Sequence, residues 1–303
     1  HLDCPTLQLA NHHGLMIAGE AALSNWDAGM DMYIYGKLGN LIMTKEGINV
    51  LMTNLTGKVP PILQRLDYIR FNGEAAGYLH DLTLTGLFYT GAGMVKTDVM
   101  MSIDEQSMSR TYSGSVASAD LDLGKLLNQE KKFGKVDFNV ELKGFNYKNR
   151  YPESYIKGII SSFEYSQYQY ENIMLDGVYK DGGFNGRLSM DDANGSVQID
   201  GNFNVAKTIP DFNLKASVKN LRPHDLHLSD KYENASISLG LTADFTGKSI
   251  DDMNGRISLD SLQLNAPDEG GCFLDNLTIT AGQVSGEKEL RINSSFMTAV
   301  IRG

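Results

Sequence analysis

The sequence predicts an all-β protein made of antiparallel strands. Apolar and polar residues alternate along many segments, and this period of two is typical of a strand with one solvated face. The chain contains 31 glycines but only 7 prolines, which indicates many tight turns and few rigid linkers. Spacing typical of helices is confined to short segments. These observations favour a long antiparallel sheet with one or two short helical insertions.

The alternating segments place their apolar residues on one face of the predicted sheet. Parallel strands that are covered on both faces would instead read as continuous apolar runs, so the alternation favours antiparallel pairing. The residues expected to share the apolar faces of their strands are Val136, Phe138, Val140, Leu142, Val197, Ile199, Phe203, Val205, Phe212, Leu214, Val218, Ile237, Leu239, Leu241 and Phe245.

The expected sheet is too large to remain flat in water. We expect about seventeen strands, and at ~4.8 Å between neighbours an unclosed sheet would extend roughly 80 Å. Its apolar face must be covered by curling of the sheet on itself, by a second sheet or by an apolar ligand. The similar segments 185–191 and 254–260 favour a sheet that grows by repetition.

Asn-Gly pairs are predicted to mark hairpin turns between strands. Both residues tolerate the left-handed backbone conformation that a type I′ turn requires at its central positions. The pairs are Asn72-Gly73, Asn185-Gly186, Asn194-Gly195 and Asn254-Gly255.

Helical segments are predicted within residues 44–66 and 121–132. Apolar residues of the first segment recur at helical spacing, Gly57 suits the end of its main helix, and Pro61 suits the start of a shorter one. In the second segment, Asp122 is placed to cap a helix that continues to Lys132.

Composition and charge exclude several classes of function. The net charge of -10 and the pI near 5.1 argue against a nucleic-acid partner, because such binding rests on clustered lysine and arginine. The sequence shows no uninterrupted apolar run of about 20 residues and no signal-peptide pattern. The two cysteines, Cys4 and Cys272, are too few for a disulfide framework.

No residue cluster predicts catalysis, a metal or a cofactor. His224 and His227 are only two ligands where zinc normally needs three or four. The acidic pairs 191–192 and 251–252 lack calcium-loop spacing, and turn chemistry explains them. As hairpin acids they also lack the apolar surroundings that raise the pKa of a catalytic acid. We therefore expect a protein that is not an enzyme.

Several long segments together resemble TamB proteins of Bacteroidota. Residues 134–144, 173–179 and 183–192 carry the resemblance, and residues 66–77 and 93–104 are similar to the preceding stretch of the same family. These segments consist of strand and turn residues, and the resemblance lies in their order over most of the chain.

The resemblance implies an AsmA-like β-taco, a long antiparallel sheet folded lengthwise into a half-pipe with an apolar interior. Residues 1–303 would be an internal segment of a periplasmic protein anchored in the inner membrane. The implied function is a lipid conduit that supports outer-membrane biogenesis and outer-membrane protein assembly. Phospholipid acyl chains would lie against the apolar residues listed above. A TamA-like outer-membrane barrel would be contacted through regions absent from this chain.

Two other classes fit the alternating strands. An outer-membrane barrel alternates identically but points its apolar side chains outward to lipid. A cell-surface glycan-binding or adhesive β-sandwich would present aromatic side chains, for which Tyr165, Tyr168 and Tyr170 are candidates. Solubility without detergent would separate the lipid conduit from the barrel. Binding to glycans but not to lipids would favour the sandwich over the lipid conduit.

Overall fold

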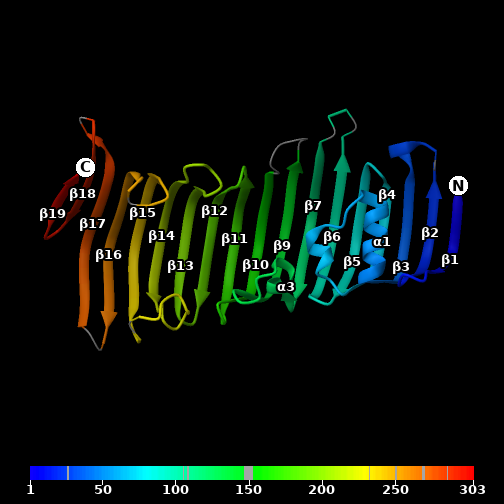
Figure 1. Ribbon diagram of the computed structural model, residues 1–303, viewed down its shortest axis with the longest axis horizontal. Coiled ribbons are helices and arrows are strands. Elements are labelled where there is room, and N and C mark those ends of the chain that lie inside the picture. Colours follow the sequence, from blue (N-terminus) through cyan, green and yellow to red (C-terminus); the bar gives the residue numbers. More distant parts are fainter. Residues whose placement is uncertain are drawn as a thin grey trace. The chain divides into compact units, whose positions relative to one another are not determined.

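The computed structural model describes residues 1–303 except 26, 105, 108, 147–152, 232, 250, 268–269 and 285, and of residues 55–56 it describes the backbone alone. Strands make up most of the chain (Figure 1). They are β1 (Leu2–Ala10), β2 (Leu15–Ser24), β3 (Tyr33–Thr44), β4 (Tyr68–Tyr78), β5 (Asp81–Thr90), β6 (Gly93–Ile103), β7 (Arg110–Ala119), β8 (Leu121–Asp122), β9 (Phe133–Asn146), β10 (Glu153–Tyr165), β11 (Tyr168–Lys180), β12 (Gly183–Asp192), β13 (Gly195–Asn204), β14 (Asp211–Leu221), β15 (Ser236–Thr246), β16 (Asn254–Ala266), β17 (Gly270–Val284), β18 (Glu287–Ser294) and β19 (Thr298–Arg302).

The strands form one 19-stranded antiparallel sheet in which neighbours along the chain pair. The short strand β8 pairs with β9, which also pairs with β7. This arrangement confirms the predicted all-β class, the antiparallel pairing and the small helical content. That the sheet is curled into a half-pipe stays a prediction.

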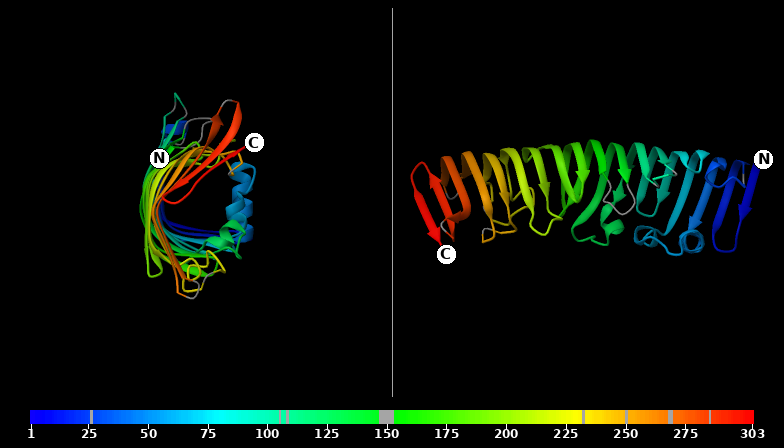
Figure 2. Two further views of the ribbon diagram at one scale, coloured as in Figure 1. Left: turned by 90° about the vertical axis from the view of Figure 1, so that its left-hand side faces the viewer. Right: turned by 90° about the horizontal axis from the view of Figure 1, so that it is seen from above.

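The chain divides into two compact units, which are described separately. Unit 1 comprises residues His1–Ser154 and Gly158–Gln169, and unit 2 comprises Tyr155–Lys157 and Tyr170–Gly303. Helix α1 (Lys45–Thr56), helix α2 (Pro61–Gln64), helix α3 (Leu123–Leu127) and the 3-10 turn η1 (Gly29–Asp31) all belong to unit 1. Figure 2 shows α1 and α3 on the same side of its strands.

The helix boundaries follow mostly from the residues predicted to set them. Thr44 accepts a hydrogen bond from the Gly47 amide at the start of α1, and Gly57 ends this helix in the left-handed conformation. Asp122 caps α3 through the Lys125 amide, as predicted. The prediction that this helix continues to Lys132 is wrong, because Asn128 adopts a left-handed conformation with φ 57° and ends it at Leu127.

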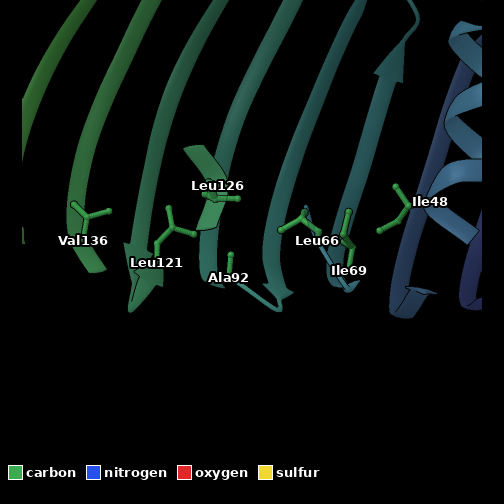
Figure 3. Close-up of a cluster of buried hydrophobic side chains, with 7 residues drawn as sticks. All are labelled: Ile48, Leu66, Ile69, Ala92, Leu121, Leu126 and Val136. Atoms are coloured by element: carbon green, nitrogen blue, oxygen red, sulfur yellow. The ribbon is translucent and has the colours of Figure 1, made fainter. Parts of the chain in front are cut away.

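The helices cover a buried apolar cluster in unit 1 (Figure 3). Helices α1 and α3 contribute Ile48 and Leu126, which are 1% and 8% exposed. The cluster also contains Leu66, Ile69, Ala92, Leu121 and Val136. Lys125 of α3 forms an ion pair with Asp67 beside this cluster, with 2.6 Å between Nζ and Oδ2. One part of the apolar face of unit 1 is thus covered by the chain's own helices.

The Asn-Gly prediction is correct at one pair and wrong at the others. Asn194-Gly195 lies at the turn between β12 and β13. Asn72-Gly73 and Asn185-Gly186 lie inside β4 and β12, and Asn254-Gly255 begins β16. A phenylalanine precedes the asparagine in the two pairs that lie inside β4 and β12. The Phe71 ring lies over Gly73 and Gly86, and the Phe184 ring lies over Gly177 of the neighbouring strand.

Close backbone contact explains why glycine occupies these strand interiors. Gly73 faces Gly86 across the β4–β5 pair, and a Cβ added to Gly73 would lie 2.6 Å from the Gly86 Cα and 2.6 Å from the Phe71 ring. In unit 2, Gly177, Gly186 and Gly201 face one another in register on β11, β12 and β13. Gly201 has φ +143°, a conformation that other residues rarely adopt. Such strand glycines mark sharp bends or close approaches.

The β18–β19 hairpin is held together by Glu289, whose side chain is 6% exposed. Its carboxylate accepts hydrogen bonds from Arg291 at 2.8 Å and from Arg302 at 2.9 Å. Hydrogen bonds from these two guanidinium groups lower the pKa of Glu289 below its ordinary value of 4.5. The charged carboxylate therefore stabilises the folded state above that value, and this contribution disappears as the pH falls through the lowered pKa.

We expect Glu289→Gln to reduce stability near pH 7 and to have a smaller effect near pH 3, because below the ordinary value of 4.5 the carboxylate of the unfolded chain is protonated and the charge contributes less to stability. Urea unfolding of both proteins at the two pH values measures the difference. An equal loss at both pH values would show that the charge on Glu289 does not contribute.

Candidate functional site

The apolar face of unit 2 consists of rows of side chains that run across its strands. The register places Phe184, Phe203, Phe212 and Phe245 in one row on β12 to β15. The ring centroids of Phe184 and Phe203 are 5.9 Å apart, and those of Phe212 and Phe245 are 4.7 Å apart. These phenylalanines form an aromatic margin on one side of the face, which we call the aromatic row.

Aliphatic side chains fill the rest of this face. Ile199, Ala216, Leu241 and Leu259 follow one another in register, and Val197, Val218 and Leu239 form the next row. The glycines of β11 to β13 lie in register between the aromatic row and these aliphatic rows, and Leu214 and Ala243 continue their line onto β14 and β15. None of the residues in these rows is charged. The face therefore offers an apolar surface several strands wide.

Most of the large side chains on this face are only half-buried. Phe203, Leu214 and Leu241 have intermediate exposure, whereas Ala243 is 4% exposed. All the helices that the structure describes belong to unit 1, so none is part of unit 2. The large side chains on this face of unit 2 therefore remain partly exposed.

The opposite face of unit 2 is polar and fixes the register. Lys157, Asp176, Arg187 and Asp200 alternate in charge on β10 to β13, and Lys215 follows in register on β14. The pairs Lys157–Asp176 and Arg187–Asp200 are 3.5 and 3.0 Å apart. A shift of one residue would move these charges to the apolar face, so the ladder disfavours other registers.

The structure brings most of the predicted apolar residues of unit 2 onto this one face. Ile237 lies on the same face of β15 and pairs with Leu221 beyond a break in register. Val205 is the exception, because β13 ends at Asn204 and the Val205 side chain is 61% exposed in the following turn. The prediction that Val205 continues the alternation of β13 is therefore wrong.

The predicted residues on β9 belong to unit 1. Val136 lies in the cluster beneath the helices, and Phe138 packs against it. Val140 faces Val116 across the β7–β9 pair, and Leu142 faces Gly114. The helices thus cover the apolar face of β9 at Val136, whereas Val140 and Leu142 are half-buried.

Comparisons with known proteins add no relative. No protein-family model, curated protein or solved structure matches the chain.

The acidic pair 191–192 ends β12 and the pair 251–252 lies in a turn, and one aspartate of each pair accepts backbone hydrogen bonds. Asp252 accepts from the amides of Lys248 and Ser249, and these bonds lower its pKa to about 2. Asp192 accepts from the amide of Asn194. Within the described part of the chain, no group of three or more His, Cys, Asp or Glu residues is arranged to hold a metal ion. Among the same residues, no helix is long and apolar enough to cross a bilayer.

The tyrosines proposed as a glycan platform have structural contacts. Tyr165 lies 5.5 Å from Phe133, measured between ring centroids, in unit 1. Tyr170 is 8% exposed in unit 2, and its hydroxyl donates a hydrogen bond of 2.7 Å to the carbonyl of Leu226, which is fully buried. Tyr170 therefore holds the loop before β15 in place and is not exposed for stacking on a sugar.

We expect Tyr170→Phe to lower the free energy of unfolding by about 1–2 kcal/mol, because it leaves the buried Leu226 carbonyl without this donor. Urea unfolding measures the change. Tyr179→Phe is a suitable control, since Tyr179 is 39% exposed, and its effect should stay within about 0.5 kcal/mol. Equal effects of the two substitutions would contradict a special role for the Tyr170 hydroxyl.

Proposed function

We propose that the apolar face of unit 2 binds the acyl chains of phospholipids, as part of a TamB-like lipid conduit. The observation that carries this proposal is the continuous, uncharged and half-exposed surface formed by the aromatic and aliphatic rows on β12 to β16. The chain would act without covalent chemistry, since a surface of this kind needs only to exclude water.

The energetics of the hydrophobic effect favour such a ligand. Each methylene group that leaves water for an apolar surface gains ~0.8 kcal/mol. A polar headgroup can stay in water at the margin of the sheet while the acyl chain is buried. Because Ile199 on β13, Leu241 on β15 and Leu259 on β16 present similar aliphatic surfaces in one row, movement between them meets no deep energy well. Transport along the rows is therefore compatible with binding.

A curled sheet would increase the contact between such a ligand and the protein. Gly177, Gly186 and Gly201 support a lengthwise bend, since a Cβ at any of them would collide with the neighbouring strand. The aromatic row and the Ile199 row would then stand on opposite sides of the bend. We propose the half-pipe on this basis together with the sequence resemblance.

The resemblance supplies the proposed cellular setting. The chain would be an internal segment of a periplasmic protein that is anchored in the inner membrane and supports outer-membrane biogenesis and outer-membrane protein assembly. Contact with a TamA-like outer-membrane barrel would be made by other regions of such a protein.

Native mass spectrometry of the protein purified without detergent, combined with lipid extraction, tests the proposed function. We expect phospholipid to accompany the folded chain and to be absent from a soluble β-sandwich of similar size. A folded chain that is reproducibly free of lipid would contradict the conduit and favour an apolar face closed by protein contacts alone. Glycan binding without lipid would favour the adhesive sandwich.

A further inference from the structure

The turn between β13 and β14 presents apolar side chains beside the two middle members of the aromatic row, Phe203 and Phe212. Val205 and Ile209 are 61% and 58% exposed, and residues 205–209, which we call the rim loop, are all exposed. The loop directly follows β13 and precedes β14, so Phe203 and Phe212 flank it in sequence. The exposed aliphatic side chains thus adjoin the apolar face of unit 2.

The backbone of the rim loop is fixed at both ends. The buried side chain of Asn204 accepts hydrogen bonds from the amides of Ala206 and Lys207, at 3.0 and 3.2 Å, and donates one of 2.9 Å to the Asp181 carbonyl. At the other end, the carbonyl of buried Pro210 accepts from the Gly247 amide at 3.0 Å. These contacts hold Val205 and Ile209 outward, although their burial would otherwise be favourable.

The chemistry of the loop indicates which partner it contacts. A stable protein interface buries roughly 800 Å² on each partner, far more than two aliphatic side chains provide. Shallow insertion into a bilayer needs less apolar surface and is reversible. The charge of Lys207 is balanced by Asp211 at 2.7 Å, so the loop carries little net charge into such an interface.

We propose that the rim loop docks on the surface of a lipid bilayer by inserting Val205 and Ile209, so that acyl chains pass between the bilayer and the aromatic row. This inference rests on the proposed function and adds its point of exchange with a membrane. The net charge of -10 repels anionic headgroups, so docking is strongest on uncharged surfaces.

Flotation of the full chain with phosphatidylcholine vesicles tests this docking. The double substitution Val205→Ser/Ile209→Ser should reduce the vesicle-bound fraction about tenfold, because both inserted side chains become polar. The matched control is Leu228→Ser, which removes an aliphatic side chain that is 53% exposed on the loop at the other end of β14. Its bound fraction should equal that of the wild type, and circular dichroism should show all three proteins folded.

Phospholipid carried by each purified protein is measured in parallel, which separates docking from binding. If the wild type carries lipid but floats no better than the double variant, docking by the rim loop is overturned and the conduit stands. An equal loss of flotation in Leu228→Ser also overturns the loop assignment. If the wild type carries no lipid, the conduit fails, and the docking inference that rests on it fails too.

Discussion

Gly201→Ala is expected to lower the free energy of unfolding by about 3 kcal/mol or more. A Cβ at this position would overlap the carbonyl oxygen of Asn213 and lie 2.5 Å from the Leu214 Cα, which are backbone atoms of the neighbouring strand. The φ of +143° adds strain for any residue with a side chain. Relief requires separation of β13 from β14, and the paired residues on both strands would then lose contact.

Gly240→Ala is the matched control for this substitution. It also lies inside a strand of unit 2, but its added Cβ would meet the nearest atom, the Asp260 carbonyl oxygen, at an ordinary 3.6 Å. Its effect should be below about 1 kcal/mol. Urea unfolding followed by circular dichroism measures both variants. Similar stabilities of the two variants would show that the strands near Gly201 separate easily, which would contradict the close approach of β13 and β14 at this glycine.

The contrast between these glycines shows where sequence reasoning succeeds and where it stops. Alternation predicted which residues of β13 to β15 share a face, because the period of two belongs to the strand itself. Asn185-Gly186 was misassigned to a turn because the same dipeptide suits a type I′ hairpin and a close approach between strands. Only the partner strand, which places Gly177 opposite Gly186, distinguishes the two uses.

The candidate site depends on register, which the sequence of one strand does not determine. Phe203, Phe212 and Phe245 were predicted on separate alternating segments, and pairing aligns them with one another and with Phe184, which was not predicted. The Phe-Asn-Gly triplets at 71–73 and 184–186 are the signal that sequence reasoning missed. An aromatic residue two positions before a strand glycine is placed to cover it, as the Phe71 ring covers Gly73.

Val205 was misassigned for a related reason. The alternation of β13 extends through Val205 in the sequence, but Asn204 binds the amides of residues 206 and 207 and turns the chain. Local capping by an asparagine thus overrides the apolar pattern. Asn204 therefore ends β13 before Val205 and also shapes the exposed rim loop that follows.

Leu214→Asp is expected to reduce the phospholipid carried by unit 2 about tenfold or more. Leu214 is half-buried in the middle of the apolar face, between Gly201 and Ala243 on the neighbouring strands. A carboxylate there stays charged only in contact with water, so an acyl chain cannot cover it without a large desolvation cost. Because the side chain is not fully buried, water can reach the new carboxylate when lipid is absent, and the fold should survive.

The measurement is lipid extraction and mass spectrometry on detergent-free protein, and Thr242→Asp is the matched control. Thr242 pairs with Lys215 on the polar face, so the new charge lies on the far side of the same sheet, and lipid content should not change. Circular dichroism and urea unfolding establish that each variant is folded, and Leu239→Asp replaces Leu214→Asp if the latter unfolds. If folded Leu214→Asp or Leu239→Asp carries as much phospholipid as the wild type, the phospholipid binds elsewhere. If Thr242→Asp also loses phospholipid, the loss is a general effect of acidic charge.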